Sequence, residues 1–115
     1  MSDPNYYPAP RECATMVSFG NRCFLTGGIN YDVVNEFEGI LLSGDTVTMY
    51  KLDCQNPDKI QGRMAHSSVL FKDKVVTFGG CQMYNKKRAV RDCLNQVVLY
   101  DISRNVVTTV KQKGV

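Results

Sequence analysis

Several features that would point to a membrane protein, a metalloprotein or a hydrolase are missing from this sequence. No run approaches the roughly 20 consecutive apolar residues of a membrane-spanning helix, so we expect no membrane partner. There is one histidine, His66, which is too few for a histidine metal site and is the residue that a Ser-His-Asp or Cys-His site would require. The cysteines form no CxxC motif and no zinc-ligand pair; they are Cys13, Cys23, Cys54, Cys81 and Cys93. We therefore expect no metal, no cofactor and no enzymatic activity.

Strong charge is also missing. The 14 basic and 11 acidic side chains leave a net charge of +3 over 115 residues. Nucleic-acid binding calls for a basic stripe and a higher isoelectric point, so no nucleic-acid partner is expected. The first ten residues lack the charged-then-apolar pattern of a signal peptide, and the odd cysteine count favours reduced thiols. We expect a cytoplasmic protein with the length of one domain.

What the sequence does contain is an internal repeat. Residues 11–28 (RECATMVSFGNRCFLTGG) align without a gap on residues 63–80 (RMAHSSVLFKDKVVTFGG), at an offset of 52 (63 − 11). The alignment places Arg11 on Arg63 and the glycine pair 27–28 on the pair 79–80. Further along, residues 45–52 (DTVTMYKL) align on residues 95–102 (NQVVLYDI), at an offset of 50. A repeat of this length predicts that the architecture is built from two similar units.

The repeated pattern resembles the kelch repeat. It consists of an arginine, an apolar strand, a polar turn, a second strand ending in Gly-Gly, a variable loop and a strand ending in tyrosine. The resemblance covers about residues 11–112, and its period of roughly 50 residues is that of one four-stranded propeller blade. Kelch repeats usually carry a tryptophan near the end, and this chain has none. The resemblance implies an all-β fold of two four-stranded antiparallel kelch-like blades, part of a β-propeller.

The expected elements follow from this alignment. Residues 1–10 hold three of the four prolines and form an extended lead-in, followed by blade 1 (residues 11–62) and blade 2 with a short tail (residues 63–115). In blade 1 we predict strands at 13–19, 22–26 and 45–52, a weak fourth strand within 53–62, and a long loop at 29–44 that can contain a short helical or strand segment. In blade 2 we predict strands at 67–71, 75–78, 95–102 and 106–110, with a second long loop at 81–94.

The resemblance implies structural roles for the recurring positions, which are Arg11, Gly27, Gly28, Tyr50, Arg63, His66, Gly79, Gly80 and Tyr100. His66 occupies a slot that Ala14 fills in the first copy, which favours a structural role over a catalytic one. The arginines either pair with a carboxylate or a carbonyl within the fold or line the propeller face. Adjacent glycines allow close backbone approach; a phosphate-cradling loop would need a helix after them, and residues 29–44 do not resemble one.

The two long loops differ in sign, since residues 29–44 are acidic and residues 81–94 are basic. Loops at the ends of a rigid scaffold often carry binding, and aromatic and Arg residues are enriched in interfaces. The alternative is that these charges are simply solvated. The candidate binding residues are Tyr31, Phe37, Tyr84, Lys86, Lys87, Arg88 and Arg91. The acidic residues of the first loop include Asp32, Glu36 and Glu38, and no pattern places two of them across a cleft as glycoside hydrolysis requires.

The function that the resemblance implies is non-enzymatic protein binding through inter-strand loops, with an unidentified protein partner. One alternative is a fragment of a larger kelch propeller (a ubiquitin-ligase adaptor, a cytoskeletal protein or an enzyme) without function of its own. Copper-radical, isomerase or specifier chemistry, known in kelch-like propellers, would need residue clusters from several blades. Propellers close with typically 4–8 blades, so we expect either further blades in the native chain or a ring of identical copies.

Overall fold

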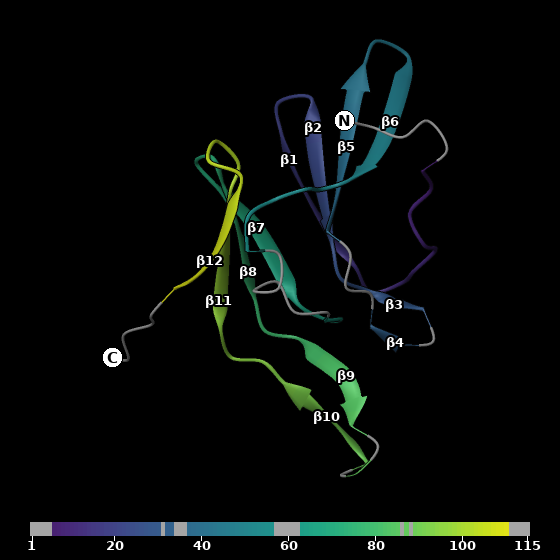
Figure 1. Ribbon diagram of the computed structural model, residues 1–115, viewed down its shortest axis with the longest axis vertical. Coiled ribbons are helices and arrows are strands. Elements are labelled where there is room, and N and C mark those ends of the chain that lie inside the picture. The colour runs from purple at the N-terminus through teal and green to yellow at the C-terminus, as the bar shows by residue number, and fades with distance from the viewer. Residues whose placement is uncertain are drawn as a thin grey trace.

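The fold consists of β-strands, seen here in a computed structural model that describes residues 6–30, 32–33, 37–56, 63–85, 87 and 89–110. Two four-stranded antiparallel sheets carry the architecture (Figure 1). The first sheet has the order β1-β2-β5-β6 and the second the order β7-β8-β11-β12. No helix occurs among the described residues, and hence none long and apolar enough to cross a membrane. The all-β prediction is confirmed.

The bounds of the strands follow alternating and β-branched runs broken by turn residues. The first sheet comprises β1 (Thr15–Phe19), β2 (Arg22–Thr26), β5 (Phe37–Ser43) and β6 (Thr46–Lys51). The second comprises β7 (Ser67–Phe71), β8 (Lys74–Phe78), β11 (Val97–Asp101) and β12 (Val106–Val110). Gly20, at φ 62°, turns the first hairpin, and Lys72, at φ 57°, turns its counterpart. Both adopt the left-handed conformation that such tight turns require.

Two short hairpins interrupt the sheets between their second and third strands. They are β3–β4 (Ile29–Asn30 with Asp32–Val33) and β9–β10 (Cys81–Asn85 with Val90–Cys93). Strands β4 and β9 contact each other, and Figure 1 shows both hairpins at the lower end of the molecule, away from the turns within the sheets. We call this region, formed by β3, β4, β9 and β10, the hairpin end.

The core lies between the two sheets. Register pairs Val17 with Phe24, so both project from the face of the first sheet that meets the second. Phe24 and Phe37 pack on Tyr100, with ring centroids 5.6 and 4.9 Å apart. The other buried apolar residues of this core are Leu52, Cys54, Val75, Val98, Ile102 and Val107. Tilted and edge-on aromatic contacts of this kind contribute about 0.5–1.5 kcal/mol each beyond the burial of their area.

The repeat at offset 52 is present in the backbone. Cys13 and Ala65 both have positive φ, at 61° and 57°. Glu12 bridges to Ile29 in the first unit, as Met64 bridges to Cys81 in the second. The two units therefore share the conformation of their first half, from the arginine through the second strand.

The predicted alignment of the second half is wrong. Residues 45–52 were expected as the third strand of the first sheet, but β6 (Thr46–Lys51) is its fourth, and the third is β5 (Phe37–Ser43), inside the predicted loop. The equivalent turn bonds, from Leu42 N–H to the Asn21 carbonyl and from Ile102 N–H to the Asp73 carbonyl, give an offset of 60 (102 − 42) for this strand. Tyr50 and Tyr100 therefore stand on a fourth and a third strand and are not equivalent.

Other predicted boundaries shift less. Residues 13–14 precede β1 instead of belonging to it, and the predicted loop at 81–94 contains the paired strands β9 (Cys81–Asn85) and β10 (Val90–Cys93). A fourth strand within residues 53–62 does not occur in the part that is described, residues 53–56. There Gln55 instead forms a parallel bridge to Val106 of the second sheet. Residues 57–62 and the predicted tail, residues 111–115, lie outside the described residues.

Candidate functional site

The repeated arginines bind the repeated glycines in the same way. Arg11 donates from a guanidinium nitrogen to the Gly27 carbonyl at 3.2 Å, and Arg63 donates to the Gly79 carbonyl at 3.2 Å. In each unit, the bond joins an arginine that precedes the first strand to the glycine that follows the second strand. Of the two roles predicted for the arginines, the structure shows bonding to a carbonyl within the fold.

The glycine pairs hold the backbone in a conformation that other residues rarely adopt, because all four have positive φ, from 68° to 101°. They differ in the space around them. A Cβ on Gly80 would lie 2.5 Å from the Met64 carbonyl oxygen, and one on Gly28 2.9 Å from the Glu12 carbonyl oxygen. A Cβ on Gly79 would meet nothing closer than the Leu94 carbonyl oxygen at 3.7 Å. Gly28 and Gly80 therefore allow the close approach of the segments that carry Glu12 and Met64.

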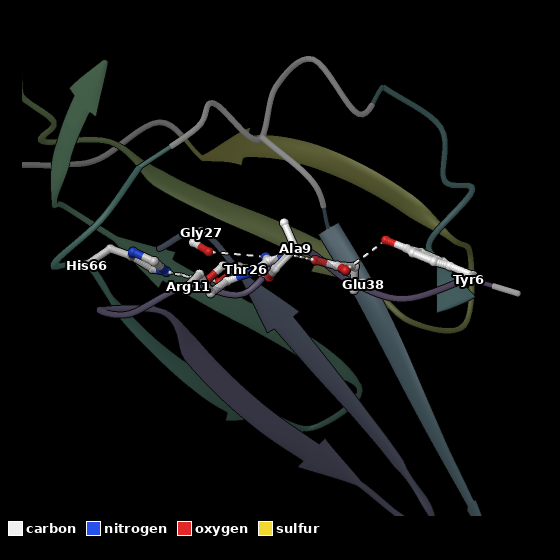
Figure 2. A network of polar contacts seen from close by, with 7 residues as sticks. All are labelled: Tyr6, Ala9, Arg11, Thr26, Gly27, Glu38 and His66. Carbon is white, nitrogen blue, oxygen red and sulfur yellow. Dashed lines mark hydrogen bonds and ion pairs between the residues drawn. The ribbon is translucent and has the colours of Figure 1, made fainter. Parts of the chain in front are cut away.

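His66 joins the two sheets. Its Nε2 lies 3.1 Å from the Thr26 carbonyl oxygen and 2.9 and 3.0 Å from the hydroxyls of Thr15 and Thr26. A carbonyl only accepts, so Nε2 carries the ring proton and donates. Figure 2 shows the ring directed at Thr26. The side chain thus belongs to the interface between the two units, where Gly27 leaves room for it: a Cβ there would lie 2.3 Å from the ring.

The environment of His66 opposes its protonation. Burial lowers the pKa of His66, the charge of Arg63 lowers it further, and the bond to the Thr26 carbonyl partly offsets both. Among the described residues, the buried Nδ1 has no hydrogen-bond partner. A proton placed there would be a buried donor without an acceptor, which is costly. The imidazole is therefore held neutral, with Nε2 engaged by three oxygens.

Arg11 also belongs to a second polar cluster, on the outward face of the first sheet. It forms an ion pair with Glu38, and the Tyr6 hydroxyl donates to the other Glu38 oxygen at 2.7 Å. The exposed fractions of the Arg11 and Glu38 side chains are 4% and 0%. Figure 2 shows the line of contacts from Gly27 through Arg11 and Glu38 to Tyr6. Removing one partner of such a buried pair typically costs about 3–5 kcal/mol, because it leaves a charge unpaired in the interior.

The second sheet has no acid at the equivalent position. Leu25 pairs with Glu38 in the first sheet, and the corresponding residue Thr77 pairs with Val98 in the second. Arg63 is 1% exposed, and burial lowers its pKa from the usual value. It lies on the side of its sheet that meets the first unit, so the interface between the units covers it. Residues 6–11 cover the equivalent side of the first sheet.

The predicted binding residues are distributed unequally. Phe37 is 5% exposed and lies in the core, so its predicted role as a partner contact is wrong for this fold. Tyr84 on β9 and Arg91 on β10 are register partners at the hairpin end, and Lys87 is exposed in the turn between these strands. Tyr31, Lys86 and Arg88 lie outside the described residues. Beside the hairpin end is an open hollow of about 480 Å³ lined by Pro10, Arg11, Glu12, Ile29 and Asn30.

The predicted structural tyrosines, Tyr50 and Tyr100, form hydrogen bonds of their own. The Tyr100 hydroxyl donates to the Asn105 side chain at 2.6 Å, and burial raises the pKa of Tyr100 to about 12. The Tyr50 hydroxyl accepts from Arg22 at 3.2 Å. Neither tyrosine belongs to the His66 or Glu38 clusters, so both serve the packing of the core.

Four residues of these clusters were not among the predicted structural or binding residues: Tyr6, Thr15, Thr26 and Glu38. The threonines lie on adjacent strands in register and are 3.0 Å apart between their hydroxyl oxygens. In the sequence, the only indication for these two threonines was that they lie in predicted strands. No described group of three or more His, Cys, Asp or Glu side chains is arranged to hold a metal ion. Comparison of the sequence with protein-family models and with curated proteins finds no match to either.

Proposed function

We propose that this chain is a non-enzymatic protein-binding module of kelch-like blades, which acts in the cytoplasm and binds a protein through the hairpin end. The observation that carries the proposal is the contact between β4 and β9. It brings the two inter-strand hairpins, from different sheets, to one end of the molecule. Loops and hairpins held in this way by a rigid scaffold are common binding surfaces.

The charge of the turn between β9 and β10 favours an acidic protein partner. The turn between β9 and β10 carries Lys86, Lys87 and Arg88 in sequence, and the described side chain among them, Lys87, is exposed. Such a basic turn accelerates encounter with an acidic surface by long-range attraction. The His66 and Glu38 side chains are buried, and His66 Nε2 and the Glu38 carboxylate are bonded within the fold, so they support stability instead of recognition.

A photo-crosslinking residue at Lys87 tests the proposal. We expect it to capture a defined protein from a cytoplasmic extract, whereas the same residue at Asp45, in the exposed β5–β6 turn, captures none. With the captured protein purified, Lys86→Glu, Lys87→Glu and Arg88→Glu together are expected to slow association and to weaken its salt dependence. An unchanged on-rate in a folded variant, or equal capture at both positions, would contradict the proposal.

A second proposal, that the chain is part of a larger propeller, is favoured by the outward face of the second sheet. At offset 52, Val69 is the counterpart of Val17 and Phe78 the counterpart of Thr26. Val17 and Thr26 are 8% and 3% exposed because the second sheet covers them, whereas Val69 and Phe78 are 59% and 48% exposed. Phe71, on the same face, is 60% exposed. We infer that a further sheet covers this face, from further blades of a longer chain or from another copy.

A further inference from the structure

Cys81 and Cys93 lie opposite each other at the base of the β9–β10 hairpin. They are register partners, and their sulfur atoms are 4.0 Å apart. Cys93 is exposed and Cys81 is partly exposed. A disulfide has sulfurs about 2.05 Å apart, so the two residues are thiols in this structure. They lie 12 positions apart in the sequence (93 − 81) and form no motif that the spacing of cysteines would identify.

The backbone geometry of this pair suits a cross-strand disulfide. The Cys81 N–H and carbonyl both bond to Met64, at 2.9 and 3.0 Å, and so point away from β10. The adjacent bond, from Leu94 N–H to the Gly80 carbonyl at 2.8 Å, connects the two chains one residue further along. Cys81 and Cys93 are therefore a non-hydrogen-bonded antiparallel pair, in which Cα atoms are about 4.5 Å apart and side chains are closest. Disulfides span Cα separations of about 4.4–6.8 Å.

We propose that Cys81 and Cys93 form a site of reversible oxidation by hydroperoxides, closing a disulfide across the base of the hairpin. The exposed Cys93 thiolate attacks one oxygen of hydrogen peroxide and becomes a sulfenic acid, with hydroxide as the leaving group. The Cys81 thiolate then attacks the Cys93 sulfur and displaces hydroxide. In sum, two thiols and one hydrogen peroxide give one disulfide and two waters. The bond restricts the hairpin that carries the exposed Lys87.

Cys54 provides an internal contrast. It is 7% exposed in the core, and burial raises the pKa of its thiol, which disfavours the reactive thiolate. Under mild oxidant, reactivity is therefore expected at the hairpin pair and not at Cys54.

Peroxide treatment of the reduced full chain, followed by alkylation in denaturant and mass spectrometry, tests the proposal. The reduced chain takes up five alkyl groups, and the oxidised chain is expected to take up three (5 − 2). Trypsin cuts between the two cysteines, so peptides 75–86 and 92–104 should remain joined until a reductant separates them. Cys93→Ser should abolish this joined pair, while the control Cys23→Ser should retain it.

Three results would overturn the proposal: oxygen added to Cys81 or Cys93 without a link between them, a link between different cysteines, or five alkyl groups after oxidation. The wild-type peptide map decides among these outcomes, even if a variant fails to fold. Amide hydrogen exchange of residues 81–93 in the oxidised and reduced chain gives a second readout, which should be slower in the oxidised form. Equal exchange would show that the link does not restrict the hairpin.

Discussion

Glycine at position 80 does more than provide a left-handed turn. Gly79 needs only its positive φ, whereas Gly80 also needs the space that a Cβ would take from the Met64 carbonyl. Gly79→Ala should therefore cost about 1–2 kcal/mol, the price of the left-handed conformation, and Gly80→Ala should cost more. Urea denaturation of the two variants measures the difference, with Gly20→Ala, where nothing surrounds the missing Cβ, as a further comparison. Equal losses at positions 79 and 80 would show that the close approach is unimportant.

The neutral His66 predicts a pH dependence of stability. Its pKa is lowered in the fold and is about 6.5 in the unfolded chain. As the pH falls through this value, the unfolded state takes up a proton that the folded state does not, so the free energy of unfolding decreases. The decrease should begin near pH 6.5 and continue until the folded-state pKa is reached.

His66→Gln tests whether His66 causes this pH dependence, because glutamine keeps a hydrogen-bond donor but does not titrate in this range. Thermal melts at pH 7 and pH 5 should show a smaller loss of stability in the variant than in the wild type. The carboxylate of Asp73, whose pKa is lowered to about 2, chiefly by the Ser103 hydroxyl, contributes only at more acidic pH. If the two proteins lose stability in parallel between pH 7 and pH 5, His66 is not the group responsible.

Among the elements, β5 depends on a small residue beneath an aromatic ring. Gly39 pairs with Tyr50 across β5 and β6, and a Cβ on Gly39 would lie 2.2 Å from the Tyr50 ring. Gly39→Ala should lower the free energy of unfolding by about 1–3 kcal/mol through overpacking. Tyr50→Val removes the obstructing ring, so the double variant should lose less than the sum of the two single losses. Additive losses would indicate that the pair does not interact.

This strand also shows where sequence interpretation succeeded and failed. The first halves of both units were predicted nearly to the residue, because their arginine, turn and glycines recur at one offset. The aligned blocks of the repeat end at Gly28 and resume at Asp45, so the sequence predicts a loop where β5 lies, with Glu38 and Gly39 inside it. Glu38 is explained by its ion pair with Arg11, and Gly39 by the Tyr50 ring that lies against it. Neither contact can be inferred from the local sequence. His66 and Ala14 occupy equivalent positions of the two units, and their difference also has a tertiary cause. Within the described structure, only the second unit packs against a preceding sheet.

The site was less predictable than the fold. The arginines and glycines were identified as structural, but Tyr6, Thr15, Thr26 and Glu38 join their networks through contacts between distant segments. The Thr15 hydroxyl, for example, donates to Ser68 across the interface at 2.8 Å. The sequence predicts Phe37 at a binding surface because it predicts a loop at residues 29–44. Aromatic residues occur both in hydrophobic cores and in binding surfaces. Only the pairing of the strands shows which of these two roles Phe37 has.

At the scale of the whole molecule, the uncovered face of the second sheet predicts self-association of the isolated chain. Val69, Phe71 and Phe78 form an apolar surface of a kind that marks interfaces or aggregation. Light scattering should therefore show a discrete oligomer or aggregates, and Val69→Lys with Phe71→Lys should reduce the apparent mass. Ser43→Lys, at an exposed position away from this face, serves as the control. A wild-type monomer that does not bind a hydrophobic dye would contradict this prediction.

The bridge between Gln55 and Val106 has a consequence for how the molecule can be divided. A segment that follows the first sheet in sequence lies along the outer strand of the second, and the Asn105 side chain donates to the Asp53 carbonyl at 2.7 Å. The two repeats are therefore interleaved, and a cut between them would remove backbone partners from both halves. We therefore expect the two repeats to unfold together, and the gain or loss of one copy would leave the outer strand of its neighbour without these backbone partners.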